Sequence, residues 1–155
     1  MRLAFVIQRY GPDLAGGAEQ LCRQIALRLR DEHRIEVLTT TARDFTTWVG
    51  PGDFPSGLEE IEGLTVRRFP VERPRRPRRF VWMTRAVHRL PHTLAFERRW
   101  IEAQGPYAPQ LVRHIRERAG DYDALVFFCY RYYPAFMGAR AAPGFRKPST
   151  YFMGR

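Results

Sequence analysis

Two neighbouring glycines, Gly16 and Gly17, stand between an apolar run and a helical pattern near the start of the chain. A glycine loop that opens a helix lets a ligand approach the backbone, and the unpaired N–H groups and the helix dipole favour an anion there. Ala18 lies beside the glycines, and Glu19 falls in the first helical turn. Glu19 is expected either to contact a ligand or to act as an acidic partner of the helix dipole. The loop therefore predicts a site for a phosphate group or a sugar hydroxyl.

Further polar and aromatic residues follow the ends of two predicted buried strands. Gln8, Arg9 and Tyr10 come after the first apolar run, and Tyr130 and Arg131 come after a later one. Ligands of open parallel sheets usually bind at the carboxyl ends of the strands. We predict that these residues contact a donor or an acceptor, with packing as the alternative role of the tyrosines. Arg131 is a stronger candidate than the tyrosines, because a guanidinium can form two parallel hydrogen bonds to a phosphate.

The elements that position these residues predict an α/β fold, with a Rossmann-like parallel sheet flanked by helices. The continuous apolar run at residues 3–7 predicts a central strand buried on both faces, and an amphipathic helix follows the glycines. Residues 64–71 alternate apolar and basic side chains, which predicts an edge strand. Other strands are predicted at 34–41, 124–129 and 149–153, and other helices at 80–90, 93–104, 109–119 and 134–141.

Two segments are expected to be insertions in this fold. The loop at residues 42–63 is polar and rich in turn residues, and a loop of this length is uncommon unless it serves function. The segment at residues 67–79 is rich in arginine and proline, and its prolines disfavour a regular helix. Its arginines, from Arg67 to Arg79, are expected either to remain solvated or to contact an anionic membrane surface.

The formal net charge of +10 raises nucleic acid as a partner, because clustered cations bind phosphate backbones. The basic residues are spread along the chain, however, so nucleic acid is a weaker expectation. No apolar stretch is long enough to cross a bilayer, and no signal peptide is present. We therefore expect a cytoplasmic protein, with peripheral contact to the inner face of the membrane as a further expectation. The histidines and cysteines lack metal-ligand spacing, so neither a metal nor a cofactor is predicted.

Several common catalytic motifs are absent from the sequence: G-x-S-x-G, G-x-x-x-x-G-K and H-E-x-x-H do not occur. Classical dinucleotide binding is also disfavoured. The loop at residues 8–17 lacks G-x-G-x-x-G, and threonines 39–41 stand where the acidic residue that binds the ribose is expected. These absences argue against a dehydrogenase.

The chain resembles the N-terminal domain of a GT-B glycosyltransferase, and most closely the large retaining family GT4. The resemblance covers the whole chain, and the Gly-Gly-Ala-Glu loop at residues 16–19 is its most specific part. It rests further on the strand RLAFV at 2–6, the strand EVLTT at 36–40 and the segment DYDALV at 121–126.

This resemblance implies the N-terminal half of a two-domain enzyme that moves a sugar from a nucleotide-diphosphate donor to a glycan, lipid or other acceptor. The glycine loop would face the donor phosphates, which assigns that role to Gly16, Gly17 and Ala18. Many members carry a histidine near the end of the later strand, where this chain has Tyr130 and Arg131. The C-terminal donor-binding domain, with its paired glutamates, is missing, and the chain ends inside a predicted strand. We therefore expect a truncated acceptor-side domain, inactive alone, and the catalytic residues remain unassigned.

Two other functions stay open. The first is a non-catalytic nucleic-acid-binding module that uses the arginine run with Phe80 and Trp82, because cationic grooves with stacking aromatics bind single strands. The second is a nucleotide-binding regulatory module that uses the glycine loop.

Overall fold

The computed structural model describes residues 1–50 and 52–144. The sheet has the strand order β3-β4-β2-β1-β5, and every pair of neighbours is parallel except β3 and β4, which are antiparallel. Its strands are β1 (Arg2–Val6), β2 (Arg34–Thr40), β3 (Gly57–Ile61), β4 (Leu64–Phe69) and β5 (Ala124–Phe127). The helices are α1 (Gly17–Leu29), α2 (Pro77–Arg89), α3 (Leu94–Gln104), α4 (Pro109–Arg118) and α5 (Tyr133–Ala141). The predicted α/β class is confirmed.

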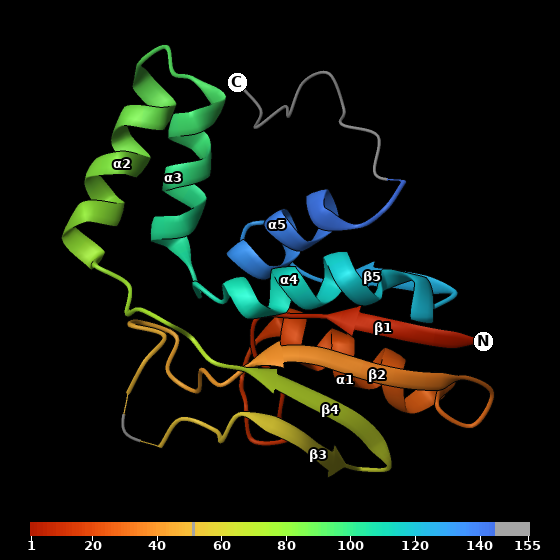
Figure 1. Cartoon of the computed structure of the whole chain (residues 1–155). Helices are drawn as coiled ribbons and strands as arrows, with labels where there is room; N and C mark the ends of the chain where they lie inside the picture. Colours follow the sequence, from red (N-terminus) through yellow and green to blue (C-terminus); the bar gives the residue numbers. More distant parts are fainter. Residues whose placement is uncertain (51, 145–155) are drawn as a thin grey trace.

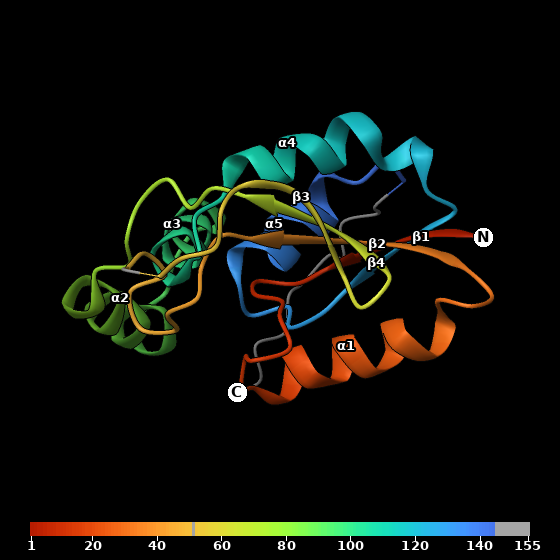
Figure 2. The ribbon, with the colours of Figure 1, turned by 90° about the horizontal axis from the view of Figure 1, so that it is seen from below.

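Helices cover both faces of the sheet. Figure 2 shows α1 on one face and α4 on the other, with α5 on the side of α4 in Figure 1. Alternate residues of β1 supply the two cores: Phe5 packs with Cys22 on the α1 side, and Val6 packs with Leu111 on the α4 side. Because successive strand residues point to opposite faces, a strand covered on both sides must be apolar throughout. The predicted central position of this strand is confirmed.

The predicted edge position of β4 is wrong. β4 lies inside the sheet between β2 and β3, and the edge strand on this side is β3, which falls within the expected loop at 42–63. The alternation in β4 has another cause. Leu64 and Val66 are buried in the α1-side core, whereas Arg67 forms an ion pair with Glu36 of the neighbouring strand. The basic side chains therefore have carboxylate partners within the sheet.

The arginine- and proline-rich segment is likewise divided between regular elements. Its first arginines belong to β4, and Pro77 is the first residue of α2. Proline is tolerated at this position because the first helical turn leaves its N–H groups unpaired in any case. The expected insertion at 67–79 is thus corrected to a strand end, a short connection and a helix start.

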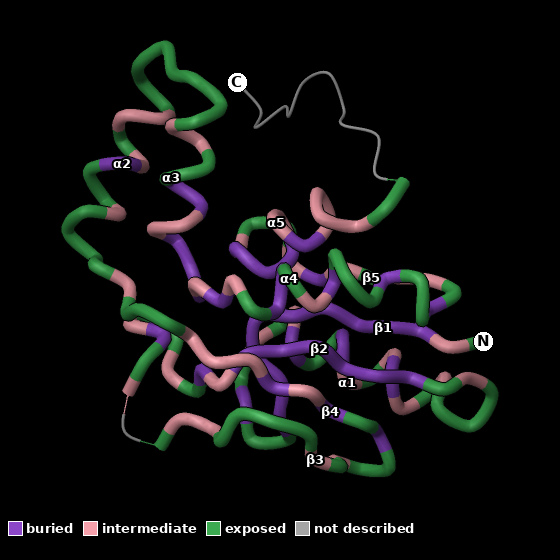
Figure 3. Tube along the Cα trace, in the orientation of Figure 1, coloured by how far each residue is buried: buried purple, intermediate pink, exposed green. Residues whose placement is uncertain are grey.

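Helices α2 and α3 form a hairpin that stands away from the sheet (Figure 1). Met83, Trp100 and Ile101 form a third core with Val112 and Tyr133 of the helices on the sheet. Figure 3 shows that the hairpin tip is exposed. The helices expected at 80–90, 93–104, 109–119 and 134–141 are all present within a few residues, whereas the strand expected at 149–153 lies outside the described residues.

None of the helices in the described ranges has both the length and the apolar character that crossing a bilayer requires. Cys22 is buried and Cys129 is half-buried, and neither forms a disulfide.

Candidate functional site

The carboxyl edge of the sheet, between β1 and β5, is the place where the chain diverges toward opposite faces. From β1 the chain passes through α1 on one face, whereas β5 is reached through α4 on the other face. The strands pair directly, with Phe5 opposite Val126. The loops that follow such strands leave a crevice between them, which is where open α/β sheets bind ligands. The two groups of residues predicted from the sequence, 8–10 and 130–131, therefore follow adjacent strands at one edge.

A buried ion pair links the loop after β1 to the first turn of α1. Arg9 Nη2 lies 2.8 Å from Glu19 Oε1, and Arg9 Nε donates to the same oxygen at 3.1 Å. Gln8 Nε2 also donates to Glu19 Oε1, at 3.1 Å. The side chains of Arg9 and Glu19 are 8% and 6% exposed. The paired charges hold the loop and the helix start in a fixed relation.

Arg9 reaches two further segments. Its Nη1 donates to the carbonyl of Arg43 at 3.0 Å, and its Nη2 approaches the carbonyl of Ala15 at 3.4 Å. Thr40 Oγ1 at the end of β2 donates to the carbonyl of Gln8 at 2.6 Å. These bonds give Gln8, Arg9 and Glu19 a positioning role inside the protein. The ligand contact predicted for these three residues stays a prediction.

Gly16 and Gly17 differ in their surroundings. A Cβ atom on Gly16 would lie 2.2 Å from Glu19 Oε2, so only glycine leaves room for the buried carboxylate. A Cβ atom on Gly17 would meet no atom within 4 Å, and Gly17 is exposed. Ala18 is half-buried and packs against the α1-side core. Gly16 thus serves the ion pair, and Gly17 gives open access to the backbone.

The start of α1 has backbone donors to offer. The first intrahelical bond runs from the Gln20 N–H to the Gly16 carbonyl, at 2.9 Å. The N–H groups of Gly17, Ala18 and Glu19 therefore precede the intrahelical bonds. No described side chain caps this end of the helix. These donors and the positive end of the helix dipole can bind an anion or a hydroxyl oxygen.

The tyrosines of the predicted site have separate environments. Tyr10 is fully buried in the α1-side core, and burial raises the pKa of its hydroxyl well above the ordinary value. The Tyr10 hydroxyl and Gln8 Oε1 have no hydrogen-bond partner among the described residues, which costs stability at this edge. Tyr130 is 72% exposed, and Arg131 is exposed beside it. Packing is therefore the role of Tyr10, whereas Tyr130 and Arg131 remain accessible to a ligand.

An aromatic cluster at the same edge was not among the predicted site residues. Phe45, Trp48 and Tyr132 contact one another edge to face, and the Arg9 guanidinium lies 5.2 Å from the centre of the Phe45 ring. Burial raises the pKa of Tyr132, and nearby Cys129 adds to that shift. Phe45 is 49% exposed and so presents a ring face or edge to solvent. The only sequence signal was the aromatic content of the long loop, which gave no indication of the partner ring after β5.

The loop after β2 is anchored to the base of the α2–α3 hairpin, at the last residue of α3 and at the segment before α2. Trp48 Nε1 donates to the Gln104 carbonyl at 2.7 Å, and Arg75 Nη2 donates to Gln104 Oε1 at 2.7 Å. The Arg75 N–H donates to the Thr47 carbonyl, also at 2.7 Å. Burial lowers the pKa of Arg75. Within the expected insertion at 42–63, Thr47 and Trp48 are therefore held by hydrogen bonds beside the carboxyl edge of the sheet.

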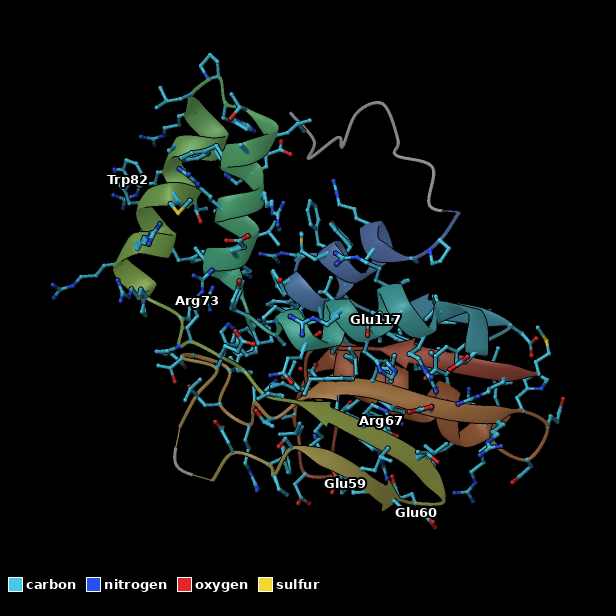
Figure 4. The ribbon with its side chains drawn as sticks, viewed as in Figure 1. Glu59, Glu60, Arg67, Arg73, Trp82 and Glu117 are labelled. Atoms are coloured by element: carbon cyan, nitrogen blue, oxygen red, sulfur yellow. The ribbon has the colours of Figure 1, made fainter. Side chains whose placement is uncertain are left out.

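The arginines between 67 and 79 do not form one exposed patch. Arg68 is buried, forms an ion pair with Glu59 and lies 3.9 Å from the centre of the Phe54 ring. Arg73 forms an ion pair with Glu102 at 3.2 Å. Figure 4 shows Arg67 over the sheet and Arg73 near the base of the hairpin, far from each other. The exposed arginines of this segment are Arg73, Arg76, Arg78 and Arg79.

A polar pocket of about 270 Å³ lies beside the first turns of α1. Gly11, Leu14, Gln20 and Arg23 contribute to its lining, together with Glu19. Arg23 is held there by an ion pair with Glu62. The pocket could take a small polar group next to the helix start. Nowhere in residues 1–50 and 52–144 do three potential metal-ligating side chains gather.

Comparison with known proteins gives no relative: no family model, no curated protein and no solved structure matches this chain. The function must therefore be inferred from the geometry of the carboxyl edge.

Proposed function

We propose that this chain forms the acceptor-side wall of the cleft of a GT-B glycosyltransferase of the GT4 type. In this proposal the enzyme transfers a sugar from a nucleotide-diphosphate sugar to a glycan, lipid or other acceptor. The observation that carries the proposal is the open, uncapped start of α1 at Gly17, held in place by the buried Arg9–Glu19 pair. A diphosphate that leaves in the reaction gains negative charge, and fixed backbone donors stabilise such charge without having to reorganise.

The residues have distinct roles in this proposal. The N–H groups of Gly17 and Ala18 donate to the donor phosphates. Arg131, exposed at the end of the adjacent strand, contacts phosphate or acceptor oxygens, and Tyr130 packs against a sugar ring. Gln8, Arg9 and Glu19 hold the loop in position through their mutual bonds. The reaction also requires a second, donor-binding domain, since the resemblance assigns the paired glutamates to that domain.

A titration of the isotopically labelled chain with UDP-glucose and GDP-mannose tests the phosphate contact. We expect the largest amide shifts in the nuclear magnetic resonance spectrum at Gly16, Gly17 and Ala18, with weak affinity because only one wall is present. Gly17→Val should remove these shifts, and Gly120→Val is the matched control, because Gly120 also has no atom near its Cβ position. Shifts confined to other parts of the chain would overturn the assignment of the α1 start.

The same titration separates the two alternatives that involve nucleotides. Free nucleoside diphosphates that bind as tightly as their sugar conjugates, with affinity typical of a complete site, would favour a regulatory nucleotide-binding module. We also expect no sugar transfer from the 155-residue chain, because the contacts to the transition state cannot assemble on one wall. Turnover by the purified chain would contradict this expectation.

For the location of the protein we propose the cytoplasm, with peripheral contact to the inner face of the membrane. The net charge of +10 supports contact with acidic lipids, to which each basic side chain near the surface adds attraction.

A further inference from the structure

Beyond its base, where Gln104 bonds to Trp48, the α2–α3 hairpin projects away from the carboxyl edge. Trp100 Nε1 donates to Thr84 Oγ1 at 2.9 Å and so joins the two helices. Phe80 stacks on Trp100, with 6.3 Å between ring centres. Met83 and Ile101 anchor the pair in the third core. The packing between the two helices therefore holds the exposed side chains of the hairpin in a defined arrangement.

The outer face of α2 carries a basic stripe with one large aromatic side chain. Arg78, Trp82, Arg85 and Arg89 are spaced i, i+4, i+7 and i+11, which places them on one helical face. All four are exposed, and Trp82 has 64% of its surface exposed. Figure 4 shows Trp82 pointing away from the body of the protein. Helix α2 contains no acidic residue, so every charged side chain on this helical face is cationic.

The tip of the hairpin adds exposed aliphatic side chains. Leu90 directly follows α2 and is 62% exposed, and Leu94 begins α3 and is 78% exposed. Val81, one residue before Trp82, is 48% exposed. Leucines held at the end of a rigid projection are placed to enter an apolar phase.

We propose that this hairpin surface, formed by Arg78, Trp82, Arg85, Arg89, Leu90 and Leu94, docks onto an anionic lipid bilayer. Arginines pair with lipid phosphates, a tryptophan is favoured at the level of the headgroups, and leucines gain by entering the acyl region. A nucleic acid would satisfy the arginines and Trp82 but would leave both leucines in water. The proposal deepens the peripheral location given above, because it names the surface, and it does not depend on sugar transfer.

Binding to vesicles in the absence of nucleotides tests the proposal separately from the proposed transferase activity. The full chain is expected to bind vesicles of phosphatidylcholine with phosphatidylglycerol, and to bind pure phosphatidylcholine far more weakly. Arg85→Gln with Arg89→Gln should weaken binding about 25-fold, since each basic residue near an acidic surface contributes roughly fivefold. Leu90→Ser with Leu94→Ser should weaken it about tenfold or more at unchanged charge.

Arg28→Gln with Arg116→Gln is the matched control. These two arginines are exposed on α1 and α4 outside the hairpin, and their loss lowers the net charge by the same amount. This pair should change vesicle binding only slightly, and circular dichroism should show every variant folded. A blue shift of tryptophan emission on binding should disappear in Trp82→Phe, because Trp48 and Trp100 are buried.

Three results would overturn the proposal. One is an equal loss of binding in the control and hairpin arginine pairs, which would mean unspecific attraction. Another is the absence of binding to anionic vesicles by the unmodified chain. The last is binding to an oligonucleotide that requires Arg85 and Arg89 but tolerates the leucine changes, which would assign the surface to nucleic acid.

Discussion

The ion pair between Arg9 and Glu19 makes a strong prediction for stability. Glu19→Gln keeps the shape of the side chain and removes its charge, so that the Arg9 guanidinium stays buried without a counter-charge. At the observed 2.8 Å, two unit charges attract by about 6 kcal/mol for an effective dielectric constant of about 20. Removal of one member of a buried pair typically costs about 3–5 kcal/mol. Arg9 retains its hydrogen bonds to the carbonyls of Arg43 and Ala15 in this variant. We therefore expect the free energy of unfolding to fall by the lower end of this range, about 3 kcal/mol.

Urea unfolding of the full chain at neutral pH, followed by circular dichroism, measures this loss. Glu62→Gln is the control, because Glu62 pairs with Arg23 of the same helix but both side chains are about one third exposed. Its loss should stay within about 1 kcal/mol. A double-mutant cycle with Arg9→Met should give a coupling energy of at least about 2 kcal/mol. A cost for Glu19→Gln no larger than that of the control would refute the reasoning from burial.

Three further substitutions test other contacts by the same unfolding assay. Gly16→Ala should cost about 2 kcal/mol or more by pushing Glu19 from its pair, whereas Gly17→Ala should stay within about 0.5 kcal/mol, and equal costs would contradict the close approach at Gly16. Gly105→Ala should cost about 2–4 kcal/mol, because Gly105 has φ 69° and a Cβ atom there would lie 2.9 Å from the buried Trp48 ring. Gly120→Ala is the control and should leave the stability unchanged, because a Cβ atom on Gly120 meets no other atom within 4 Å. Tyr122→Phe removes the 2.9 Å hydrogen bond to Glu36 and should cost about 1.5–3 kcal/mol at neutral pH. Burial and Glu36 raise the pKa of Tyr122 to about 12, so the neutral phenol favours the folded state and that stability is lost as the pH rises from about 10 to 12. The fall in this alkaline range should be shallower in Tyr122→Phe, and an unchanged slope would exclude the proposed coupling.

The central part of the fold follows from local sequence pattern. The apolar run of β1 has only one favourable environment, a strand covered on both faces, and the two glycines at positions 16 and 17 mark the start of a helix. The same local signals gave the later helices within a few residues. Their connections determine the parallel order, and with it the edge at which residues 8–10 and 130–131 emerge.

Other features depend on contacts between distant segments. The sequence predicted an edge strand at β4 because basic residues alternate there, but Glu36 on β2 and Glu59 on β3 neutralise Arg67 and Arg68 within the sheet. The arginines at 67–79 were predicted to act together, because their carboxylate partners lie elsewhere in the chain. Charge partners far away in the chain are invisible to a local pattern.

The amino-acid sequence by itself determined the α/β class, the central strand and the glycine loop that opens α1, because each depends on periodicity and backbone freedom over a few neighbouring residues. Only the tertiary structure decided which of these residues are buried and which partners they contact. It buried Arg9 and Glu19 against each other, left Gly17 and Arg131 exposed, and brought Phe45 and Tyr132 into contact from opposite parts of the chain. The physical reason is that burial and charge pairing are properties of spatial neighbours, and these are chosen by the packing of the whole chain.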